Sequence, residues 1–417
     1  MIQISNPKDC CGCETCVQVC AKQCISLHRD EKGFLYPRVI EEQCVNCGLC
    51  EKVCPVLHPF NEKEPKNIFA SKNDDERERE NSSSGGIFIL FAKQVILHGG
   101  VVFGVTFDDN WNPVHSFSET LEGLTQFQGS KYVQSRIDSA FVHVKRFLED
   151  GREVLFSGTP CQIAGLKHFL HKDYEKLLTI EVICHGVPSP GVWKDYLDSI
   201  QRPKNGIIGN NPTMSSQKKS LTIKSISFRN KQEGWQKFNF VVRFLSDNRD
   251  SSKLGFTSEN VKENIVEFHQ ENLFMRAFLK NLILRPSCFS CPAKSGRSGA
   301  DISLGDFWSI NQHLKEWNDD KGVTLVYINS DKGQDYYRHI KCSKIELNPL
   351  VHYNKMYYSS TVERYPNEKF WTQYKQDGLE AILPIYNSLA TSKKANPYKH
   401  VYSKLKKQLK AFINKLK

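Results

Sequence analysis

The chain has 417 residues, of which 39% are hydrophobic and 25% charged, a balance typical of a globular protein with two or three domains. Its net charge of +11 is concentrated near the C-terminus, where nine lysines and no acidic residue follow Thr391. The remaining chain is close to neutral, which argues against a broad nucleic-acid groove, and we expect no nucleic-acid partner.

Residues 1–10 lack the apolar core of a secretory signal, and no uncharged apolar stretch reaches the roughly 20 residues that a membrane span needs. We therefore expect a cytoplasmic protein without a transmembrane helix. In that reducing compartment, fifteen cysteines are expected to bind metal or take part in chemistry, not to form disulfides. Ten of them fall within the first 55 residues, which predicts a small separate domain over residues 1–57.

Within that segment a cysteine motif is duplicated. Cys10-x2-Cys13-x2-Cys16-x3-Cys20 recurs as Cys44-x2-Cys47-x2-Cys50-x3-Cys54-Pro55. This spacing is typical of proteins with two 4Fe-4S clusters, and the segment resembles a bacterial two-cluster ferredoxin. Ala21 stands where proline is usual in such ferredoxins, which removes no ligand.

In this motif three closely spaced thiolates wrap one cluster, while the fourth faces the other cluster. We therefore expect one cluster on Cys10, Cys13, Cys16 and Cys54, and the other on Cys20, Cys44, Cys47 and Cys50. A pair of zinc ribbons is the alternative, but it leaves the third and fourth cysteines of each repeat unexplained. Cys11 and Cys24 are left over, and we expect them to be packing residues.

After a proline-containing linker over residues 58–67, the pattern changes to helices that alternate with buried strands, which predicts a larger mixed α/β domain. Its first part, residues 68–200, has expected helices at 84–97, 136–149, 162–170 and 190–200 and strands at 101–107, 154–156 and 177–183. Residues 201–220 are rich in Pro, Gly, Asn, Ser and Lys and predict an insertion loop. The second part, residues 221–350, has an expected exposed antiparallel pair at 222–228 and 238–245, a helix at 271–282 and strands at 301–304 and 323–328.

Six short motifs follow one another in this domain: Ser82-Ser-Ser-Gly-Gly86, Gly129-Ser-Lys-Tyr132, Gly158-Thr-Pro-Cys-Gln162, Ile183-Cys-His-Gly186, Cys288-x2-Cys291 and Ala300-Asp-Ile-Ser-Leu-Gly-Asp306. Their order resembles the family of coenzyme F420 hydrogenase/dehydrogenase β subunits over about residues 68 to 350. The resemblance implies an FAD-binding iron–sulfur protein that passes electrons between one-electron carriers and a hydride carrier or a reducible organic substrate. It implies cofactor contacts at Ser84, Gly85, Gly86, Gly129, Ser130, Lys131, Tyr132, Thr159, Gln162 and Asp306.

The residue types suit a flavin nucleotide. Serine and backbone N–H groups at a helix N-terminus bind phosphates, lysine supplies a counter-charge, and tyrosine supplies an aromatic face. Several of these residues also have a structural alternative. In that case the serines would form an ordinary N-cap, Lys131 would be a solvated residue beside a half-buried Tyr132, and Asp306 would cap the next turn instead of contacting the cofactor.

Four more cysteines suggest a third cluster. Cys161 and Cys184 each follow a predicted strand, and the carboxyl ends of strands in an α/β sheet converge on one crevice. Cys288 and Cys291 supply a further pair, and the family resemblance favours the same four ligands. Alternatively, Cys161 and Cys184 are buried small hydrophobes, and the other two form a redox or zinc pair. Cys342 has no partner and is expected to be structural.

His185, beside Cys184, is the candidate catalytic residue, since an imidazole there can donate a proton to a substrate as hydride arrives. The alternative is that it binds a carbonyl at the strand end.

The extension over residues 351–417 ends in a predicted amphipathic helix, with apolar residues at helical spacing: Tyr402, Leu405, Leu409, Phe412, Ile413 and Leu416. Lysines fill most of its other positions. Such a helix packs back on the α/β domain, contacts anionic lipid as a peripheral membrane anchor, or binds an acidic protein partner.

Together these features predict an oxidoreductase that passes electrons from ferredoxin-type clusters through FAD to or from a hydride-accepting organic substrate or a deazaflavin coenzyme. The expected partners are that substrate and a redox protein such as ferredoxin. The alternative is an electron-transfer subunit without a substrate site of its own. A zinc-stabilised nucleic-acid adaptor fits the basic tail but not the duplicated cysteine motif.

Overall fold

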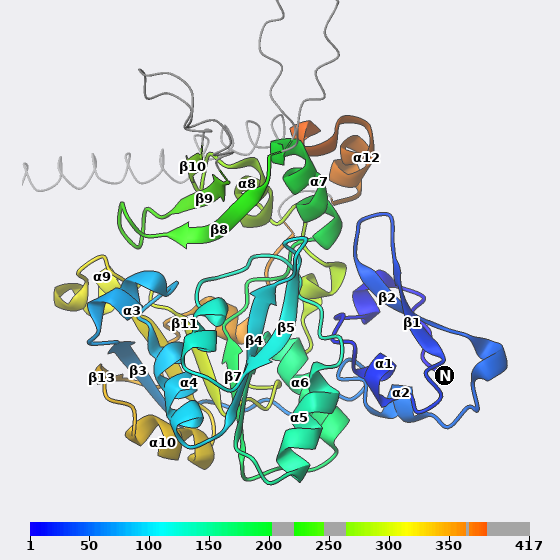
Figure 1. Ribbon diagram of the computed structural model, residues 1–417, viewed down its shortest axis with the longest axis horizontal. Coiled ribbons are helices and arrows are strands. Elements are labelled where there is room, and N and C mark those ends of the chain that lie inside the picture. Colours follow the sequence, from blue (N-terminus) through cyan, green and yellow to red (C-terminus); the bar gives the residue numbers. More distant parts are fainter. Residues whose placement is uncertain (202–220, 246–263, 364–366, 382–417) are drawn as a thin grey trace, which may run out of the picture.

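The computed structural model describes residues 1–201, 221–245, 264–363 and 367–381 (Figure 1). The insertion loop predicted after Gln201 and the amphipathic helix predicted near the C-terminus lie outside these residues. Among the described helices, none has the length and apolar character that crossing a membrane requires.

The cysteine-rich segment, residues 1–57, is built on the antiparallel hairpin of β1 (Ile25–Arg29) and β2 (Leu35–Val39). Each cysteine motif contains a short helix, α1 (Thr15–Val19) or α2 (Leu49–Lys52), and 3-10 turns lie at η1 (Pro7–Asp9) and η2 (Glu41–Gln43). Both helices start after a residue in the left-handed conformation, Glu14 with φ 61° and Gly48 with φ 74°. The two repeats therefore fold alike and form a ferredoxin-like region.

The rest of the chain is organised around one large mixed sheet. Its strand order is β13 (Ser343–Leu347), β3 (Asn67–Lys72), β12 (Thr324–Ile328), β11 (Ile302–Asp306), β7 (Leu177–Val182), β6 (Val154–Gly158), β4 (Val101–Phe107) and β5 (Pro113–Ser118). The four central strands β11, β7, β6 and β4 are parallel, and the outer strands pair antiparallel. The predicted fold class, a small ferredoxin-like region followed by a larger mixed α/β domain, is thus confirmed.

Helices cover both faces of this sheet, as its buried parallel strands require. On one face, α4 (Ile87–Leu97) and α10 (Asp331–Arg338) pack on a core that includes Leu155 and Ile180. On the other, α5 (Ala140–Glu149) and α6 (Pro160–Leu170) pack on Phe103 and Phe156. The cysteine-rich segment lies beside α5 and α6 (Figure 1).

A second, small sheet consists of β8 (Ile223–Asn230), β9 (Asn239–Phe244) and β10 (Ile265–Phe268). With α7 (Pro190–Gln201), α8 (Leu273–Leu279) and α12 (Asn367–Asp377) it forms the upper part of Figure 1. The predicted antiparallel pairing of β8 with β9 is correct, but the prediction that this pair is exposed is wrong. One face is buried because Phe228 and Phe240 pack on Trp193 and Phe274.

The predicted starts of α4 and α5 are too early by at least three residues, and that of α8 by two. α4 begins at Ile87 instead of residue 84, because Gly86 has the left-handed φ of 75°. Likewise α5 begins at Ala140 instead of residue 136, and Asp138 has a φ of 47°. The remaining elements are α3 (Glu76–Asn81), η3 (Glu122–Phe127), η4 (Pro286–Ser290), α9 (Ile310–His313), η5 (Lys315–Trp317), α11 (Lys355–Tyr358) and η6 (Gly378–Ala381).

Candidate functional site

The first cysteine set consists of Cys10, Cys13, Cys16 and Cys54. All four line one cavity, whose walls are otherwise mainly apolar and include Ile2, Leu27 and Leu35. Burial raises the pKa of Cys54, and the neighbouring Cys13 and Cys10 act in the same direction. The fold therefore brings the last cysteine of the second motif to the first three of the first motif. Four thiols around one apolar-walled space are a donor set that suits an iron–sulfur cluster.

The second cysteine set consists of Cys20, Cys44, Cys47 and Cys50. Cys20, Cys44 and Cys50 pack into the small core of the cysteine-rich segment, whereas Cys47 is exposed. The backbone N–H of Ile2 donates to Cys50 Sγ at 3.3 Å. Cys24 is buried in the same core, with its Sγ 3.4 Å from that of Cys20.

The third cysteine set consists of Cys161, Cys184, Cys288 and Cys291. Cys161 lies in the first turn of α6, Cys184 follows β7, and the other two lie in and just after η4. Burial raises the pKa of Cys288 well above its usual value, and Cys184, Cys291 and Cys161 add to this effect. The structure thus brings these four thiols together from three separate parts of the chain.

Cys11 lies between the first and third sets. Hydrogen bonds with Cys13 and Cys161 raise the pKa of the Cys11 thiol well above its usual value. The Cys11 contact also lowers the pKa of Cys13 to about 7. The sequence indicated only a packing role for Cys11, because Cys161 is far from it along the chain.

Side chains of the cysteine-rich segment also bind the first turn of α5 and the residues just before it. Glu14 Oε2 accepts hydrogen bonds from the backbone N–H groups of Ile137 at 3.2 Å and Asp138 at 3.0 Å. Gln18 Oε1 accepts from the N–H of Phe141 at 3.1 Å. These contacts fix the segment against the α/β domain.

Across the residues that the structure describes, no three His, Cys, Asp or Glu side chains lie close enough to hold a single metal ion. The ligands of a cluster bind at its corners, farther apart than four thiolates around one zinc ion.

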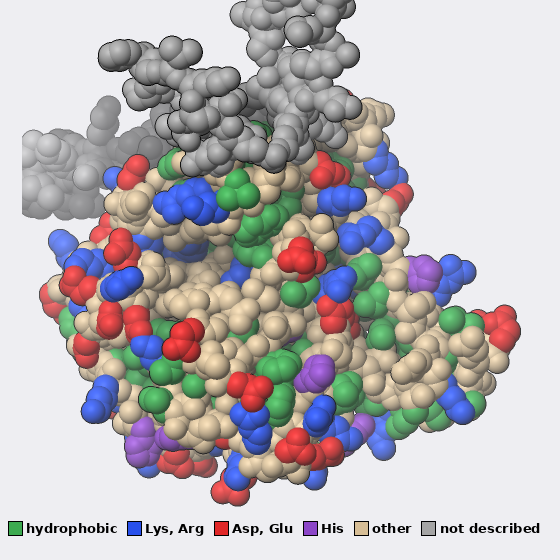
Figure 2. Space-filling view, in the orientation of Figure 1, with side chains coloured by type: hydrophobic (Ala, Val, Ile, Leu, Met, Phe, Trp, Pro, Cys, Tyr) green, Lys and Arg blue, Asp and Glu red, His purple; other side chains and the backbone are tan. Residues whose placement is uncertain are grey.

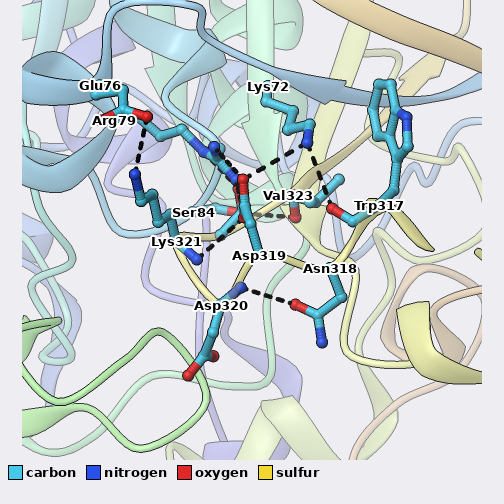
Figure 3. Close-up of polar contacts among 12 residues, drawn as sticks. Lys72, Glu76, Arg79, Ser84, Trp317, Asn318, Asp319, Asp320, Lys321 and Val323 are labelled. Atoms are coloured by element: carbon cyan, nitrogen blue, oxygen red, sulfur yellow. Dashed lines mark hydrogen bonds and ion pairs between the residues drawn. The ribbon is translucent and has the colours of Figure 1, made fainter. Parts of the chain in front are cut away.

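The Ser82–Gly86 loop is held by its own chain (Figure 3). Ser84 Oγ donates to the Val323 carbonyl at 3.0 Å, and the N–H of Gly85 donates to Thr324 Oγ1 at 2.9 Å. A Cβ at Gly85 would come within 2.5 Å of the Ser71 carbonyl oxygen. Gly85 is therefore required by packing against β3 and β12, whether or not a ligand binds nearby.

An ion pair fixes the neighbouring loop after η5, also drawn in Figure 3. Arg79 Nε donates to the Gly322 carbonyl at 2.8 Å, and its two terminal nitrogens bind the Asp319 carboxylate at 2.8 and 2.5 Å. The pKa of Asp319 is lowered to about 2, because hydrogen bonds from Arg79 and Lys321 outweigh the opposing effect of burial.

The Gly129–Tyr132 loop lies beside the serine loop, since Ser130 Oγ donates to Ser83 Oγ at 2.7 Å. Gly129 has a left-handed φ of 78° and open space where a Cβ would lie. Lys131 Nζ donates to the carbonyls of Gln126 and Gln128, and burial lowers its pKa to about 8. The ring of Tyr132 packs on the aromatic rings of Phe228 and Phe278.

Thr159 and Gln162 have structural partners. They form a capping box at the start of α6, in which the Thr159 N–H donates to Gln162 Oε1 at 2.9 Å. The amide of Gln162 also donates to Ser135 Oγ at 2.9 Å. These contacts explain both residues without a cofactor.

His185 lies just beyond β7, where the sequence placed it. Its Nε2 is 2.6 Å from Asn281 Oδ1, and its ring meets Phe278 edge to face.

Asp306 ends β11 and binds two residues of the small-sheet region. Its Oδ2 accepts from Arg229 Nη1 at 2.5 Å and its Oδ1 from Trp235 Nε1 at 2.9 Å. Burial opposes the charge on Arg229, but Asp306 and Tyr132 offset that effect and raise the pKa of this guanidinium. One of the two expectations was that Asp306 caps the next turn, but its side chain binds Arg229 and Trp235 instead.

Arg229 is a basic residue that sequence reasoning missed. It is buried, and its guanidinium lies over the rings of Phe238 and Trp308 at 4.7 and 4.9 Å. Among the described residues, nothing hydrogen-bonds its Nε or Nη2. These two groups form one edge of the guanidinium, the edge that binds a phosphate or carboxylate with two parallel bonds.

Lys231, two residues further on, was also missed. Its Nζ donates to the carbonyls of Arg79, Ser84 and Lys321 at 2.5, 3.1 and 2.8 Å, and burial lowers its pKa to about 7. Lys231 therefore joins the serine loop to the loop after η5. Figure 2 shows the surface hollowed between the small and large sheets, with Lys and Arg side chains around the hollow.

Comparisons with known proteins identify both parts of the chain. Residues 9–57 match the 4Fe-4S dicluster domain, and residues 151–352 match the C terminus of the coenzyme F420 hydrogenase/dehydrogenase beta subunit. These matches confirm the resemblances found in the cysteine motifs and the six ordered motifs.

Two curated relatives are similar over less than half of the chain. The coenzyme F420-dependent sulfite reductase of Methanocaldococcus jannaschii is 29% identical over 192 residues, which are 43% of this chain and 28% of that protein. A component of the F(420)H(2) dehydrogenase of Methanosarcina mazei is 25% identical over 188 residues, 42% of this chain and 53% of that component. The matched region thus spans about a quarter of the first relative and half of the second.

A chain in a xenon-derivatised structure of the F420-reducing [NiFe] hydrogenase complex from Methanosarcina barkeri is also similar. It has 15% identity and a TM-score of 0.41 over 66% of this chain and 79% of that one, too weak a likeness to carry an argument. The chain thus combines a 4Fe-4S dicluster domain with a region similar to the C terminus of coenzyme F420 hydrogenase/dehydrogenase beta subunits, and it is related to F420-dependent oxidoreductases.

Proposed function

We propose that the chain is an iron–sulfur flavoprotein oxidoreductase that passes electrons from its cysteine-rich segment through FAD to, or from, a hydride-accepting organic molecule. The observation that carries this proposal is the position of Cys11, in contact with Cys13 of the first cysteine set and Cys161 of the third. Because these thiols meet where the cysteine-rich segment packs on the α/β domain, they offer electrons a short route from the segment to the domain.

In this proposal each cysteine set holds one 4Fe-4S cluster, within the domain organisation predicted from the sequence. The duplicated motif and the dicluster match support the first two sets. The third is supported by the mutual proximity of its thiols and by Lys294, whose Nζ donates to the Cys184 carbonyl at 2.5 Å. That buried ammonium supplies positive charge where a cluster with four thiolates is negative.

The proposed FAD site lies at the carboxyl edge of the parallel strands, along the predicted motifs. The free edge of Arg229 supports binding of an anionic group there, and the open face of Gly129 leaves room for a ligand beside Ser130 and Lys131. Ser84, Gly85, Gly86, Thr159 and Gln162 then shape the site mainly through their own backbone and capping contacts. When bound, a flavin accepts electrons singly and exchanges them as hydride.

The proposed substrate is a deazaflavin coenzyme or another organic hydride acceptor. Both curated relatives carry coenzyme F420 in their names, which supports the first choice. Asn281 orients the ring of His185, so that the imidazole is held beside the third cysteine set. We propose that His185 holds the proton that accompanies hydride transfer.

A second candidate is an electron-transfer subunit without its own substrate site, with ferredoxin or another electron carrier as partner. One curated relative is named as a component of a larger dehydrogenase, which favours this candidate.

Activity of the isolated chain separates the two candidates. Anaerobic protein with its cofactors is mixed with a reduced one-electron donor, first without and then with F420. Rapid reduction of F420 supports the enzyme. Flavin that is reduced but never passes hydride to F420 or to other organic acceptors supports the electron-transfer role.

A further inference from the structure

Arg285 is a fully buried cation that joins the cysteine-rich segment to the third cysteine set. Its side chain is 0% exposed. Its backbone N–H donates to the Val187 carbonyl at 3.0 Å, and it stands three residues before Cys288. Its backbone therefore belongs to the α/β domain.

The guanidinium of Arg285 reaches into the cysteine-rich segment. Nε donates to the Cys10 carbonyl at 2.8 Å, and Nη2 donates to Cys10 Sγ at 3.4 Å and to the Leu35 carbonyl at 3.0 Å. Nη1 donates to Gln134 Oε1 at 3.0 Å, and the ring of Tyr36 lies 4.3 Å from the guanidinium carbon. No acidic residue in the described part of the chain forms an ion pair with it, so its positive charge faces the Cys10 sulfur.

A buried cation bound to a cluster ligand has a definite electrostatic effect. A cluster with four thiolate ligands is negatively charged, and reduction adds another negative charge. Positive charge and hydrogen bonds at the sulfur stabilise the reduced form more than the oxidised form, and screening is weak inside the protein. The described contacts of the second cysteine set differ: Cys50 Sγ accepts a neutral backbone N–H, and Cys47 is exposed.

We propose that Arg285 raises the reduction potential of the cluster on the first cysteine set above that of the cluster on the second. An electron that enters through the second set, where Cys47 is exposed, then resides on the first, at the boundary with the α/β domain. One electron moves, so the second cluster is oxidised and the first reduced, and no bond or proton is exchanged. This inference rests on the proposed cluster ligands, but not on the flavin or the substrate.

The test is a redox titration of the anaerobic full chain, followed by electron paramagnetic resonance after the iron content has been measured. In Arg285→Gln we expect one cluster midpoint to fall and the others to stay. If the electron's equilibrium preference for the first cluster over the second falls tenfold, the difference between the two midpoint potentials changes by about 59 mV. Arg285→Lys keeps the charge and should retain most of the potential. Arg152→Gln removes a cation that binds Glu119 and the Gly99 carbonyl instead of a cysteine, and should shift no midpoint.

A second variant decides the matter if Arg285→Gln fails to assemble. Gln134→Glu is nearly isosteric and places a carboxylate against Arg285 Nη1, so the same midpoint should fall while Arg285 remains. Gln134→Leu, which removes the hydrogen bond but adds no charge, should shift it much less. Unchanged midpoints in Gln134→Glu with full iron content would overturn the proposal. A wild-type chain that contains no iron–sulfur clusters would instead refute the ligand assignment.

Discussion

Thr15 and Gly165 lie in contact across the boundary between the cysteine-rich segment and α6. A Cβ at position 165 would come within 2.4 Å of Thr15 Oγ1 and 3.0 Å of the Cys13 Cβ. Thr15 Oγ1 also donates to Cys13 Sγ at 3.2 Å. The first cysteine set is therefore seated on α6 with no room for even one methyl group between them.

Gly165→Ala should move the cysteine-rich segment away from α6 and slow electron transfer between the first and third cysteine sets. We expect slower flavin reduction in rapid-mixing experiments with a one-electron donor, although iron and flavin contents stay normal. The double variant Thr15→Ala/Gly165→Ala removes the closest clash and should recover part of the rate, with Thr15→Ala alone as the control. A Gly165→Ala chain with the wild-type rate would show that this contact does not govern transfer.

Cys161→Ala should lower the iron content by about four atoms per chain, because one cluster loses a ligand while the other two persist. The same loss is expected for Cys288→Ala. Iron and acid-labile sulfide measured on anaerobic protein check both variants. Cys342 is outside all three cysteine sets, so Cys342→Ala should keep the full content. If both ligand variants keep the wild-type iron, the third cluster does not exist.

Arg229→Met should weaken FAD binding on the order of 100-fold, the effect of losing two charge-assisted hydrogen bonds to an anion. Flavin retained after gel filtration and equilibrium titration of the flavin-free chain provide the measurement. Arg243 is an exposed arginine on the adjacent strand β9, and Arg243→Met is the matched control. Equal FAD affinity in both variants would place the anionic group elsewhere.

The buried, neutral ring of His115 should make the folded chain less stable in mild acid. Its ring is buried and binds the Ser157 carbonyl at 3.1 Å, and burial lowers its pKa from 6.5 to about 4. The unfolded chain takes up this proton at higher pH than the folded chain, so the stabilisation is complete above pH 6.5 and is lost towards pH 4. Across this whole pH range the free energy of unfolding falls by roughly 3 kcal/mol.

The measurement is the anaerobic thermal unfolding midpoint between pH 7 and pH 5, where the clusters are still expected to survive. Wild type should lose more stability over this range than His115→Gln, which cannot take up the proton. Parallel curves for the two proteins would contradict the assignment.

Much of the site was predictable because its residues carry local signals. The cysteine spacings predicted two ligand sets, and the strand pattern placed Cys161 and Cys184 at the carboxyl edge where they meet Cys288 and Cys291. Glycine motifs were less informative. The sequence motif predicts that Gly85 is a ligand-binding glycine, but β3 and β12 fill the space beside it. Variants of Gly85 would therefore disturb packing before they test flavin binding.

The basic residues of the site were not predictable, since their roles depend on contacts between distant segments. Arg285 and Cys10 are 275 positions apart, and Arg229 meets Asp306 across 77. Neither arginine lies in a recognisable motif. Only the folded chain shows that one cation faces a cysteine sulfur and that the other keeps a free hydrogen-bonding edge.

The most direct test of the account is the cofactor content of anaerobically purified protein, measured as iron, sulfide, zinc and flavin per chain. We predict about twelve iron atoms with matching sulfide in three cubane clusters, and one FAD identified by mass after denaturation. Stoichiometric zinc without acid-labile sulfide, or full iron with no flavin bound even after incubation with FAD, would contradict an iron–sulfur flavoprotein.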